Sequence, residues 1–455
     1  MANRAKQELI QPIFSPTKRK RRHRIWMNKL MLSILSLIFP ILPVWELLKV
    51  IANKIFGKLI GKIILPSQNI SEKELREADA ILDKKINEIN DEHSELKLHF
   101  DRFYVRTYSG IKMDTIQLSP QDLSDKYIIN FPASNSLYER NMDFYIDQVE
   151  STGQNVIAFN HRNVNKSIGR KAGKSRSLVN DGIYQVQRLL DMKIPPENIT
   201  VTGASLGAAN ADAVALYFHD LKIPIRTFNR NGFSSLTNVV VGWIRAKINP
   251  QYKNKPDPRY YGNRETSLGI FLGALAKPFI ALFLFLMKWE INATHAYQNI
   301  PETHKEYMCV HIPKEIRKKD PEKFIGDSMV TAYASLHKSL EDDRYRKKME
   351  VQQEIKYHNK INKDHLRSPQ PPNWPELYAK TNKHRLRKMI PDEIKAKHDG
   401  HQLSPLEVEN SYGESGRKFF FLFMKNEKQS YQDVAKRLAK KPDHSYAKFK
   451  RMTVM

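Results

Sequence analysis

The stretch 201–207 constrains the fold of this chain more than any other, and it reads Val-Thr-Gly-Ala-Ser-Leu-Gly. β-Branched residues typical of a strand run into a glycine-flanked turn, and small residues that favour a helix follow. A serine at the tip of such a strand–turn–helix projects its hydroxyl above the sheet. The glycines let the two backbones pass closely. The stretch therefore predicts a nucleophile elbow at Ser205, whereas the alternative is an ordinary strand–helix turn with an incidental serine.

Apolar strands and helical segments alternate on both sides of this turn. Strands are expected at 127–131, 155–160, 199–202, 225–228 and 307–312, and helices at 141–150, 177–191 and 208–219. Such alternation predicts an α/β protein with a mostly parallel, doubly wound sheet.

Between residues 229 and 303 the alternation stops. Two apolar segments, 268–276 and 279–287, are separated by Lys277 and Pro278, and each is too short to span a bilayer. We expect a helical cap insertion over about 237–303, in which a pair of helices is buried. A lid with an apolar underside and a second membrane-dipping element are the alternatives.

The charge balance of the chain is strongly basic. The 455 residues carry a formal net charge of +26, which indicates an acidic partner such as anionic lipid, nucleic acid or an acidic protein. Nucleic acid is not expected, because the basic residues are not interleaved with aromatics and no binding motif is present. Cys309 is the only cysteine, which excludes a disulfide framework and indicates a reducing compartment. Histidines and carboxylates do not cluster at ligand spacing, so neither a metal nor a cofactor is expected.

The N-terminal region combines basic and apolar character. Residues 1–24 form a basic tail, and residues 25–66 contain an apolar run broken by Pro40 and Pro43, followed by lysines every four or five positions among apolar residues. This pattern predicts helices that lie in the interface of an anionic membrane without spanning it. A helical hairpin packed on the catalytic domain or a nuclear-import signal is the alternative. Removal of residues 1–66 is expected to release the protein from membranes without ending activity.

The remaining organisation follows from composition. A charged bridging helix is expected over 71–99, and the globular domain over 100–426. A surface insertion at about 341–390 contains the proline-rich segment 368–375, and the tail 427–455 is basic.

A serine nucleophile needs a base and an acid that orients the base. In a chain of this architecture the order is serine, acid, histidine. Asp327 follows the strand 307–312 in a loop and is the favoured acid, with Asp320 as the competitor. His401 follows Gly400 in a loop before the final helical region and is the favoured base, with His398 as the alternative.

The negative charge that develops on the substrate oxygen needs two N–H donors. Leu206, directly after the serine, supplies one. The second is expected from Ala133 or Ser134, because Pro132 at the end of the strand 127–131 has no N–H. The other histidines, His161 and His219 among them, are expected at the surface or at helix ends.

Several stretches together resemble those of serine hydrolases with the α/β-hydrolase fold, and more narrowly the SidB/SdbA-type effectors that Legionella delivers by Dot/Icm type IV secretion. They read Phe-Asn-His-Arg-Asn-Val (159–164), Ser-Leu-Val-Asn-Asp-Gly (177–182), Gly-Ala-Ser-Leu-Gly-Ala (203–208) and Phe-Asn-Arg-Asn-Gly-Phe-Ser-Ser-Leu (228–236), extended by 326–327 and 334–336. The resemblance implies a lipase- or esterase-like enzyme secreted into a host cell. Pro-Ala-Ser at 132–134 departs from the glycine-containing turn usual at the oxyanion site.

Two functions are consistent with the sequence. The first is a membrane-associated serine hydrolase that cleaves a carboxylic ester or thioester, lipid esters included. The alternative is an inactive scaffold of the same fold that binds anionic membranes or a host protein. The oligomeric state is left open by the sequence.

Overall fold

The computed structural model describes residues 8–10, 61–91, 98–247, 265–310, 330–343, 388–391, 408–410 and 416–425. The chain forms two compact units. Unit 1 comprises Met1–Asn229 and Pro278–Lys305, and unit 2 comprises Arg230–Lys277 and Glu306–Met455. The predicted tails 1–24 and 427–455, and most of the predicted segment 25–66 and of the insertion 341–390, lie outside the described residues.

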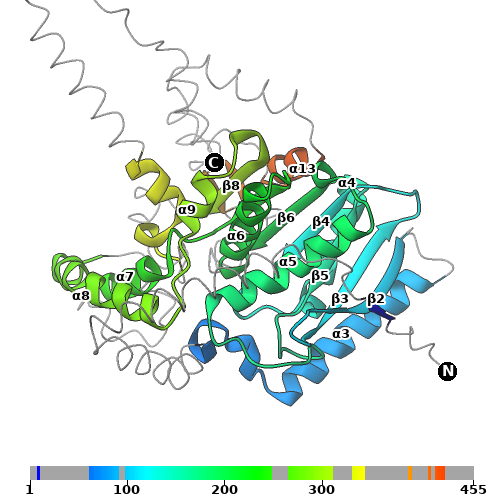
Figure 1. Ribbon diagram of the computed structural model, residues 1–455, viewed down its shortest axis with the longest axis horizontal. Coiled ribbons are helices and arrows are strands. Elements are labelled where there is room, and N and C mark those ends of the chain that lie inside the picture. The colour runs from blue at the N-terminus through cyan, green and yellow to red at the C-terminus, as the bar shows by residue number, and fades with distance from the viewer. Residues whose placement is uncertain are drawn as a thin grey trace, which may run out of the picture. The chain divides into compact units, whose positions relative to one another are not determined.

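Seven neighbouring strands, in the order β1-β2-β3-β5-β4-β6-β7, form the sheet of unit 1 (Figure 1). They are β1 (Glu8–Ile10), β2 (Leu98–Arg106), β3 (Lys112–Pro120), β4 (Tyr127–Phe131), β5 (Asn155–Phe159), β6 (Ile199–Ala204) and β7 (Arg226–Arg230). β4 runs parallel to both β5 and β6, whereas β3 pairs antiparallel with both β2 and β5. The sheet is therefore mixed. A mostly parallel sheet was expected from the sequence, because the long antiparallel pair β2–β3 was not predicted.

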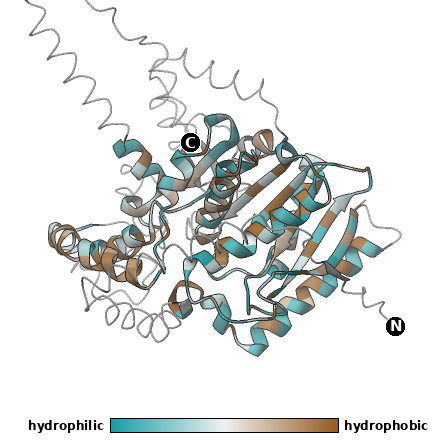
Figure 2. Ribbon diagram, in the orientation of Figure 1, coloured by the Kyte–Doolittle hydropathy of each residue, from teal (hydrophilic) through white to brown (hydrophobic). Residues whose placement is uncertain are grey.

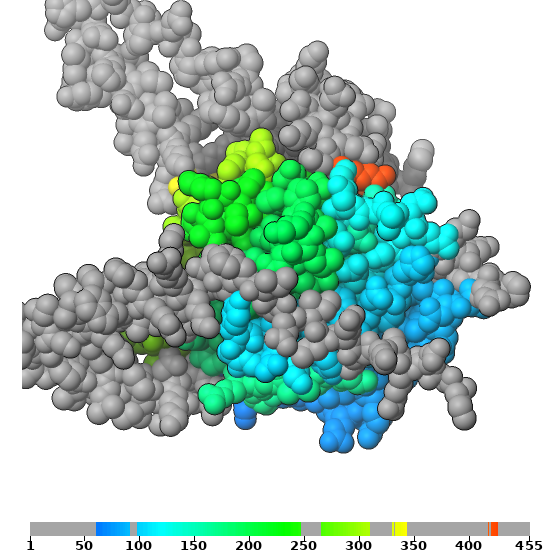
Figure 3. Space-filling view, turned by 45° about the vertical axis from the view of Figure 1, so that its right-hand side comes forward, coloured from blue at the N-terminus to red at the C-terminus, as the bar shows by residue number. Residues whose placement is uncertain are grey.

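The helices of unit 1 alternate with these strands. They are α3 (Glu72–Asn90), α4 (Met142–Thr152), α5 (Ser175–Asp191), α6 (Leu206–Asp220) and α9 (Ala293–Gln298), with short 3-10 turns η1 (Pro66–Asn69), η2 (Tyr138–Asn141), η3 (Pro196–Asn198) and η6 (Glu302–His304). The bridging helix expected over 71–99 spans Glu72–Asn90 and begins with a capping box, in which the Ser71 and Glu74 side chains bond each other's backbone N–H. Figure 3 shows α3 in blue beside the cyan residues of β2 to α4.

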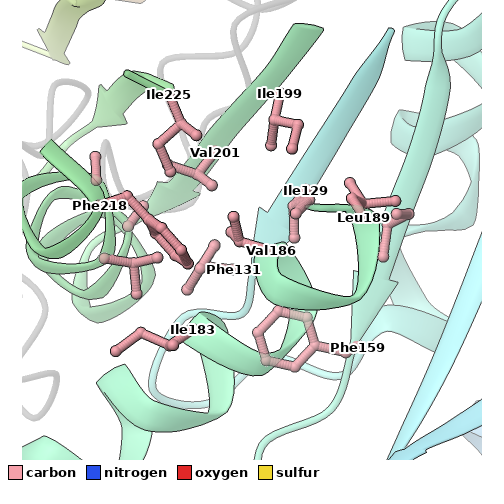
Figure 4. Packing of buried hydrophobic residues seen from close by; sticks show 14 of the residues in the cluster. Ile129, Phe131, Phe159, Ile183, Val186, Leu189, Ile199, Val201, Phe218 and Ile225 are labelled. Carbon is pink, nitrogen blue, oxygen red and sulfur yellow. The ribbon is translucent and has the colours of Figure 1, made fainter. Parts of the chain in front are cut away.

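Helices cover both faces of the sheet, as β4 demonstrates. Successive side chains of a strand point to opposite faces. The Asn130 amide donates to Gln148 of α4 at 2.7 Å, whereas Phe131 packs against Gly182 of α5, where an added Cβ would lie 2.1 Å from the ring. The apolar core on the α5 and α6 side contains Phe131, Val201 and Phe218, all at most 3% exposed (Figure 4).

One apolar helix, α8 (Ser267–Leu286), replaces the expected pair of buried cap helices. It continues through Pro278, and eight of its large apolar side chains are 41–70% exposed. The hydrophobic colours of Figure 2 run along it. By length and composition this helix could cross a membrane, with only 17% of its most apolar window buried. The prediction of a pair of buried cap helices was therefore wrong, because the segment is a single helix with most of its large apolar side chains exposed.

Unit 2 contains α7 (Leu236–Lys247), η7 (Ala332–Ala334), β8 (Lys305–Val310), β9 (Lys388–Pro391), β10 (Val408–Asn410) and α13 (Gly416–Lys425). β8 pairs parallel with β9, and β9 pairs antiparallel with β10. The backbone of α7 lies close to η7, because an added Cβ at Gly242 would meet the Thr331 hydroxyl at 2.3 Å.

Candidate active site

Ser205 occupies the single residue between β6 and α6. Its backbone has φ 54° and ψ −118°, in a region that non-glycine residues rarely adopt. An added Cβ at Gly203 would lie 2.5 Å from the backbone of Gly207, so the strand and the helix pass each other in contact. This strained, glycine-flanked geometry is that of a nucleophile elbow.

The start of α6 has free hydrogen-bonding capacity beside this serine. No side chain caps the helix, and the first N–H groups of a helix lack partners within it. Within the described ranges, the Ser205 hydroxyl makes no hydrogen bond, although the residue is only 7% exposed. The partial positive charge of the helix N-terminus therefore acts directly where an anion would form.

The turn after β4 lies against this first turn of α6. An added Cβ at Gly207 would meet the carbonyl oxygens of Phe131 at 2.3 Å and Pro132 at 2.8 Å. Leu206, next to Gly207, is thereby brought close to Ala133, next to Pro132. Neither Ala133 nor Ser134 donates its N–H within the described part of the chain, so both remain available to a ligand.

His161 fixes the orientation of this turn. Its Nε2 donates to the Pro132 carbonyl at 3.0 Å, since a carbonyl can only accept. Burial lowers the pKa of His161 to about 4, so the ring is neutral near pH 7. The peptide after Pro132 is trans, and in a trans peptide the N–H points opposite to the C=O. The His161 bond therefore sets the direction of the Ala133 N–H.

The expectation that His161 lies at the surface or at a helix end was wrong, because the residue is 1% exposed. A signal was present in the sequence: polar residues 160–162 follow directly on the fully buried strand β5. Carboxyl ends of parallel strands meet at one edge of a sheet, where sites form. His219, by contrast, bonds the Ile225 carbonyl from the last turn of α6.

Buried polar contacts hold the segment around His161. Arg162 makes a bidentate ion pair with Asp181 of α5, and its side chain is 11% exposed. Asn160 donates to Glu139 at 2.9 Å. Two residues before α3 also hold this region. The Ser67 N–H donates to the Ser134 carbonyl at 3.3 Å, and the Gln68 amide donates to the Arg162 carbonyl at 2.9 Å.

A second buried network anchors α6 behind the elbow. Asp212 accepts hydrogen bonds from Thr227 at 2.9 Å and Asn229 at 2.6 Å, and burial raises its pKa to about 7. Each of its oxygens accepts one of these bonds, so Asp212 ties α6 to the strand β7.

The remaining predicted residues, Asp327, Asp320, His401 and His398, lie outside the described residues. The structure thus places the turn after β4 against the first turn of α6. The roles of Ser205, Leu206, Ala133 and Ser134 stay predictions, as do those of the acid and the base. Among the described residues, no group of three or more His, Cys, Asp or Glu could hold a metal ion.

Comparison with protein-family models finds no match, and neither does comparison with curated proteins. Solved structures are similar over about half of the chain. An esterase from Pyrococcus furiosus is 18% identical, over 52% of this chain and 74% of its own, with a TM-score of 0.34. An alpha-beta hydrolase from Vibrio vulnificus is 15% identical, over 56% and 86%, with a TM-score of 0.34. A Pyrobaculum calidifontis esterase is 13% identical, over 54% and 75%, also with a TM-score of 0.34.

Proposed function

We propose that this protein is a serine hydrolase of the α/β-hydrolase type that cleaves carboxylic esters or thioesters, with Ser205 as the nucleophile. The observation that carries the proposal is the backbone of Ser205, strained at φ 54° between β6 and an uncapped α6. Strain of this kind persists where the surrounding structure enforces it, and it concentrates at functional sites. An incidental serine in a strand–helix turn has no need of it.

In the proposed reaction the Ser205 Oγ attacks the carbonyl carbon of the ester while a histidine accepts the hydroxyl proton. The electron pair of the carbonyl moves onto its oxygen, and the Leu206 and Ala133 N–H groups stabilise that oxyanion. The histidine returns the proton to the departing alcohol or thiol. Water then attacks the acyl-serine by the same route and restores the Ser205 hydroxyl.

His401 is the proposed base and Asp327 the acid that orients it, with His398 and Asp320 as the alternatives. In this proposal Ser134 serves as a second candidate for the oxyanion donor of the turn. His161 is a positioning residue, since it acts on the substrate only through the Pro132–Ala133 peptide.

A fluorophosphonate probe tests the nucleophile. Wild-type protein should be labelled and should hydrolyse short aryl esters, whereas Ser205→Ala should lose labelling and at least about 10³-fold in kcat. Ser151→Ala, a serine at the end of α4, is the matched control and should keep both. An unlabelled wild type would favour the inactive scaffold instead. His401→Ala against His398→Ala, and Asp327→Asn against Asp320→Asn, then assign the partners.

The membrane attachment of the enzyme and its place of action are also proposed, from sequence alone. Residues 25–66 would hold the enzyme on an anionic membrane, and the effector resemblance implies secretion into a host cell by a type IV system. A reporter-fusion translocation assay in a secretion-competent strain and a secretion-deficient strain tests the second proposal. Equal signals from the two strains would count against it.

A further inference from the structure

The outer face of α8 concentrates the exposed apolar surface of the described chain. Eight of the fourteen large hydrophobic side chains that are strongly exposed belong to it: Leu268, Ile270, Phe271, Leu275, Phe279, Leu282, Phe283 and Phe285. At 3.6 residues per turn these eight spread over roughly 220° of the helix circumference, and the packed side takes up the rest. Monomeric soluble proteins rarely expose an apolar patch of this size without a partner for it.

This face is purely apolar. Its side chains are aliphatic or phenylalanine, and the single charged residue of the helix, Lys277, turns its Nζ to the Tyr333 hydroxyl at 3.2 Å. Protein interfaces carry a polar rim and about one hydrogen bond per 100–200 Å². A face without any such group is suited to hydrocarbon and not to a folded protein partner.

Each end of α8 also makes a contact within the unit to which it belongs. Near the N-terminus, an added Cβ at Gly269 would meet the Arg245 carbonyl of α7 at 2.3 Å. At the C-terminus, the carbonyl of Lys288 accepts from the Ser175 N–H of α5 at 3.1 Å.

The amphipathic N-terminal segment enters the described structure beside the end of α8. An added Cβ at Gly61 would lie 3.0 Å from the ring of Trp289, which follows the helix directly. The exposed lysines Lys62 and Lys288 flank these two residues. The last residues of the predicted membrane segment thus lie beside the end of α8, next to two cations that can reach phosphate groups.

We propose that α8 lies in the surface layer of an anionic phospholipid bilayer, with its eight exposed side chains among the acyl chains and both ends held on the protein. This is a second membrane contact, distinct from residues 25–66. It concerns binding alone and does not depend on the reaction proposed for Ser205. The basic balance of the chain, +26 overall, complements the anionic surface.

Site-specific fluorescence in the full-length chain tests the proposal. Ser205→Ala serves as background so that lipid hydrolysis cannot alter the vesicles. A polarity-sensitive nitrobenzoxadiazole label is placed at Phe279→Cys, with Leu123→Cys as the matched control, since Leu123 is fully exposed outside α8. The native Cys309 is buried, and labelling of the parent protein gives its background.

With vesicles of phosphatidylcholine and phosphatidylglycerol, the label at 279 should shift its emission to shorter wavelength and be quenched by brominated acyl chains. The label at 123 should do neither. Protein that floats with the vesicles while the label at 279 is unchanged would overturn the proposal. A shift without vesicles that grows with protein concentration would also overturn it, because a second copy would then cover α8.

Charge substitution gives an independent measure. Phe271→Glu with Phe279→Glu should weaken vesicle binding by about tenfold or more, whereas Leu123→Glu with Ile168→Glu should leave it unchanged. Equal loss in both double variants would mean that charge alone matters, and would contradict a specific role for α8.

Discussion

The helices α6 and α8 differ in how the polarity of a side chain relates to its burial. In α6, the side chains of Asn210 and Asp212 are fully buried. The segment that follows β5 likewise buries His161 and Arg162. α8 is far more apolar, yet it exposes most of its large side chains. Polar groups are inside near the serine, and apolar groups are outside on α8.

The difference shows that each helix is fitted to its surroundings and not to its own composition. Buried polar groups are tolerated where they find partners, as Asp212 does with Thr227 and Asn229. They fix one arrangement of strand ends and turns around Ser205. The exposed apolar groups of α8 fix nothing inside the protein, so substitutions in the two regions should have opposite consequences for stability and binding.

The largest expected effect is on the buried ion pair. Asp181→Asn leaves the Arg162 guanidinium without its counter-charge in the interior, which should lower the free energy of unfolding by about 3–5 kcal/mol. Asp143→Asn is the matched control. Asp143 pairs with Lys85 at 2.8 Å but is 83% exposed, so its loss should cost less than about 1 kcal/mol. Urea denaturation of both variants measures the difference, and equal costs would refute the contrast.

The next effect is a pH dependence that originates at His161. The unfolded residue titrates near 6.5 and the folded one near 4. Between these values the unfolded state binds more protons, so stability falls as the pH falls, by about 3 kcal/mol in total. His161→Gln retains an amide donor but does not titrate. Wild type should therefore lose stability relative to this variant from pH 6.5 to pH 4, as measured by urea denaturation at each pH.

The same position distinguishes positioning from mere packing. His161→Leu should lower kcat by on the order of tenfold to a hundredfold with little change in KM, since a misdirected Ala133 N–H weakens the oxyanion site. His161→Gln should restore much of that loss. If both variants keep the wild-type kcat at equal stability, the Pro132 contact is structural only.

The smallest effect is expected on the exposed side of α8. Phe279→Ala removes a side chain that is 70% exposed and should change the free energy of unfolding by less than about 0.5 kcal/mol. Leu284→Ala, on the packed side of the same helix at 4% exposure, should cost about 2–5 kcal/mol. Thermal unfolding in the absence of vesicles makes the comparison. A large cost at Phe279 would show that its ring packs on the protein after all.

Local signals predicted the central part of the fold well. The strand Tyr127–Phe131 was expected at the bounds that it has, and the start of α6 after Ser205 follows from the glycine-flanked turn. The pair β2–β3 was missed because β2 mixes charged residues with apolar ones, as in Asp101-Arg102, and lacks a continuous apolar run. Its Arg102 finds Asp114 only across the sheet, at 2.6 Å.

For the candidate site, the sequence allowed predictions only for residues close to a recognisable strand or turn. Ser205 and Leu206 are adjacent, and Ala133 follows a recognisable strand, so roles could be assigned to them by position, and those roles stay predictions. The contact from His161 to Pro132 joins residues 29 positions apart, and no local pattern encodes it. The face that α8 exposes could not be read either, because an apolar segment looks the same whether it meets protein or lipid.

The bonds from Ser67 to Ser134 and from Gln68 to Arg162 set a sharp limit on how far the chain can be shortened. The removal of residues 1–66, expected from sequence to release the protein from membranes without ending activity, would take away Leu65, which is fully buried, and Gly61, which lies against Trp289. Trimming should stop before Gly61. Residues 61–68 thus belong to the support of the turn that carries Ala133 and Ser134, and a truncation that reaches them would change the candidate site as well as any membrane contact.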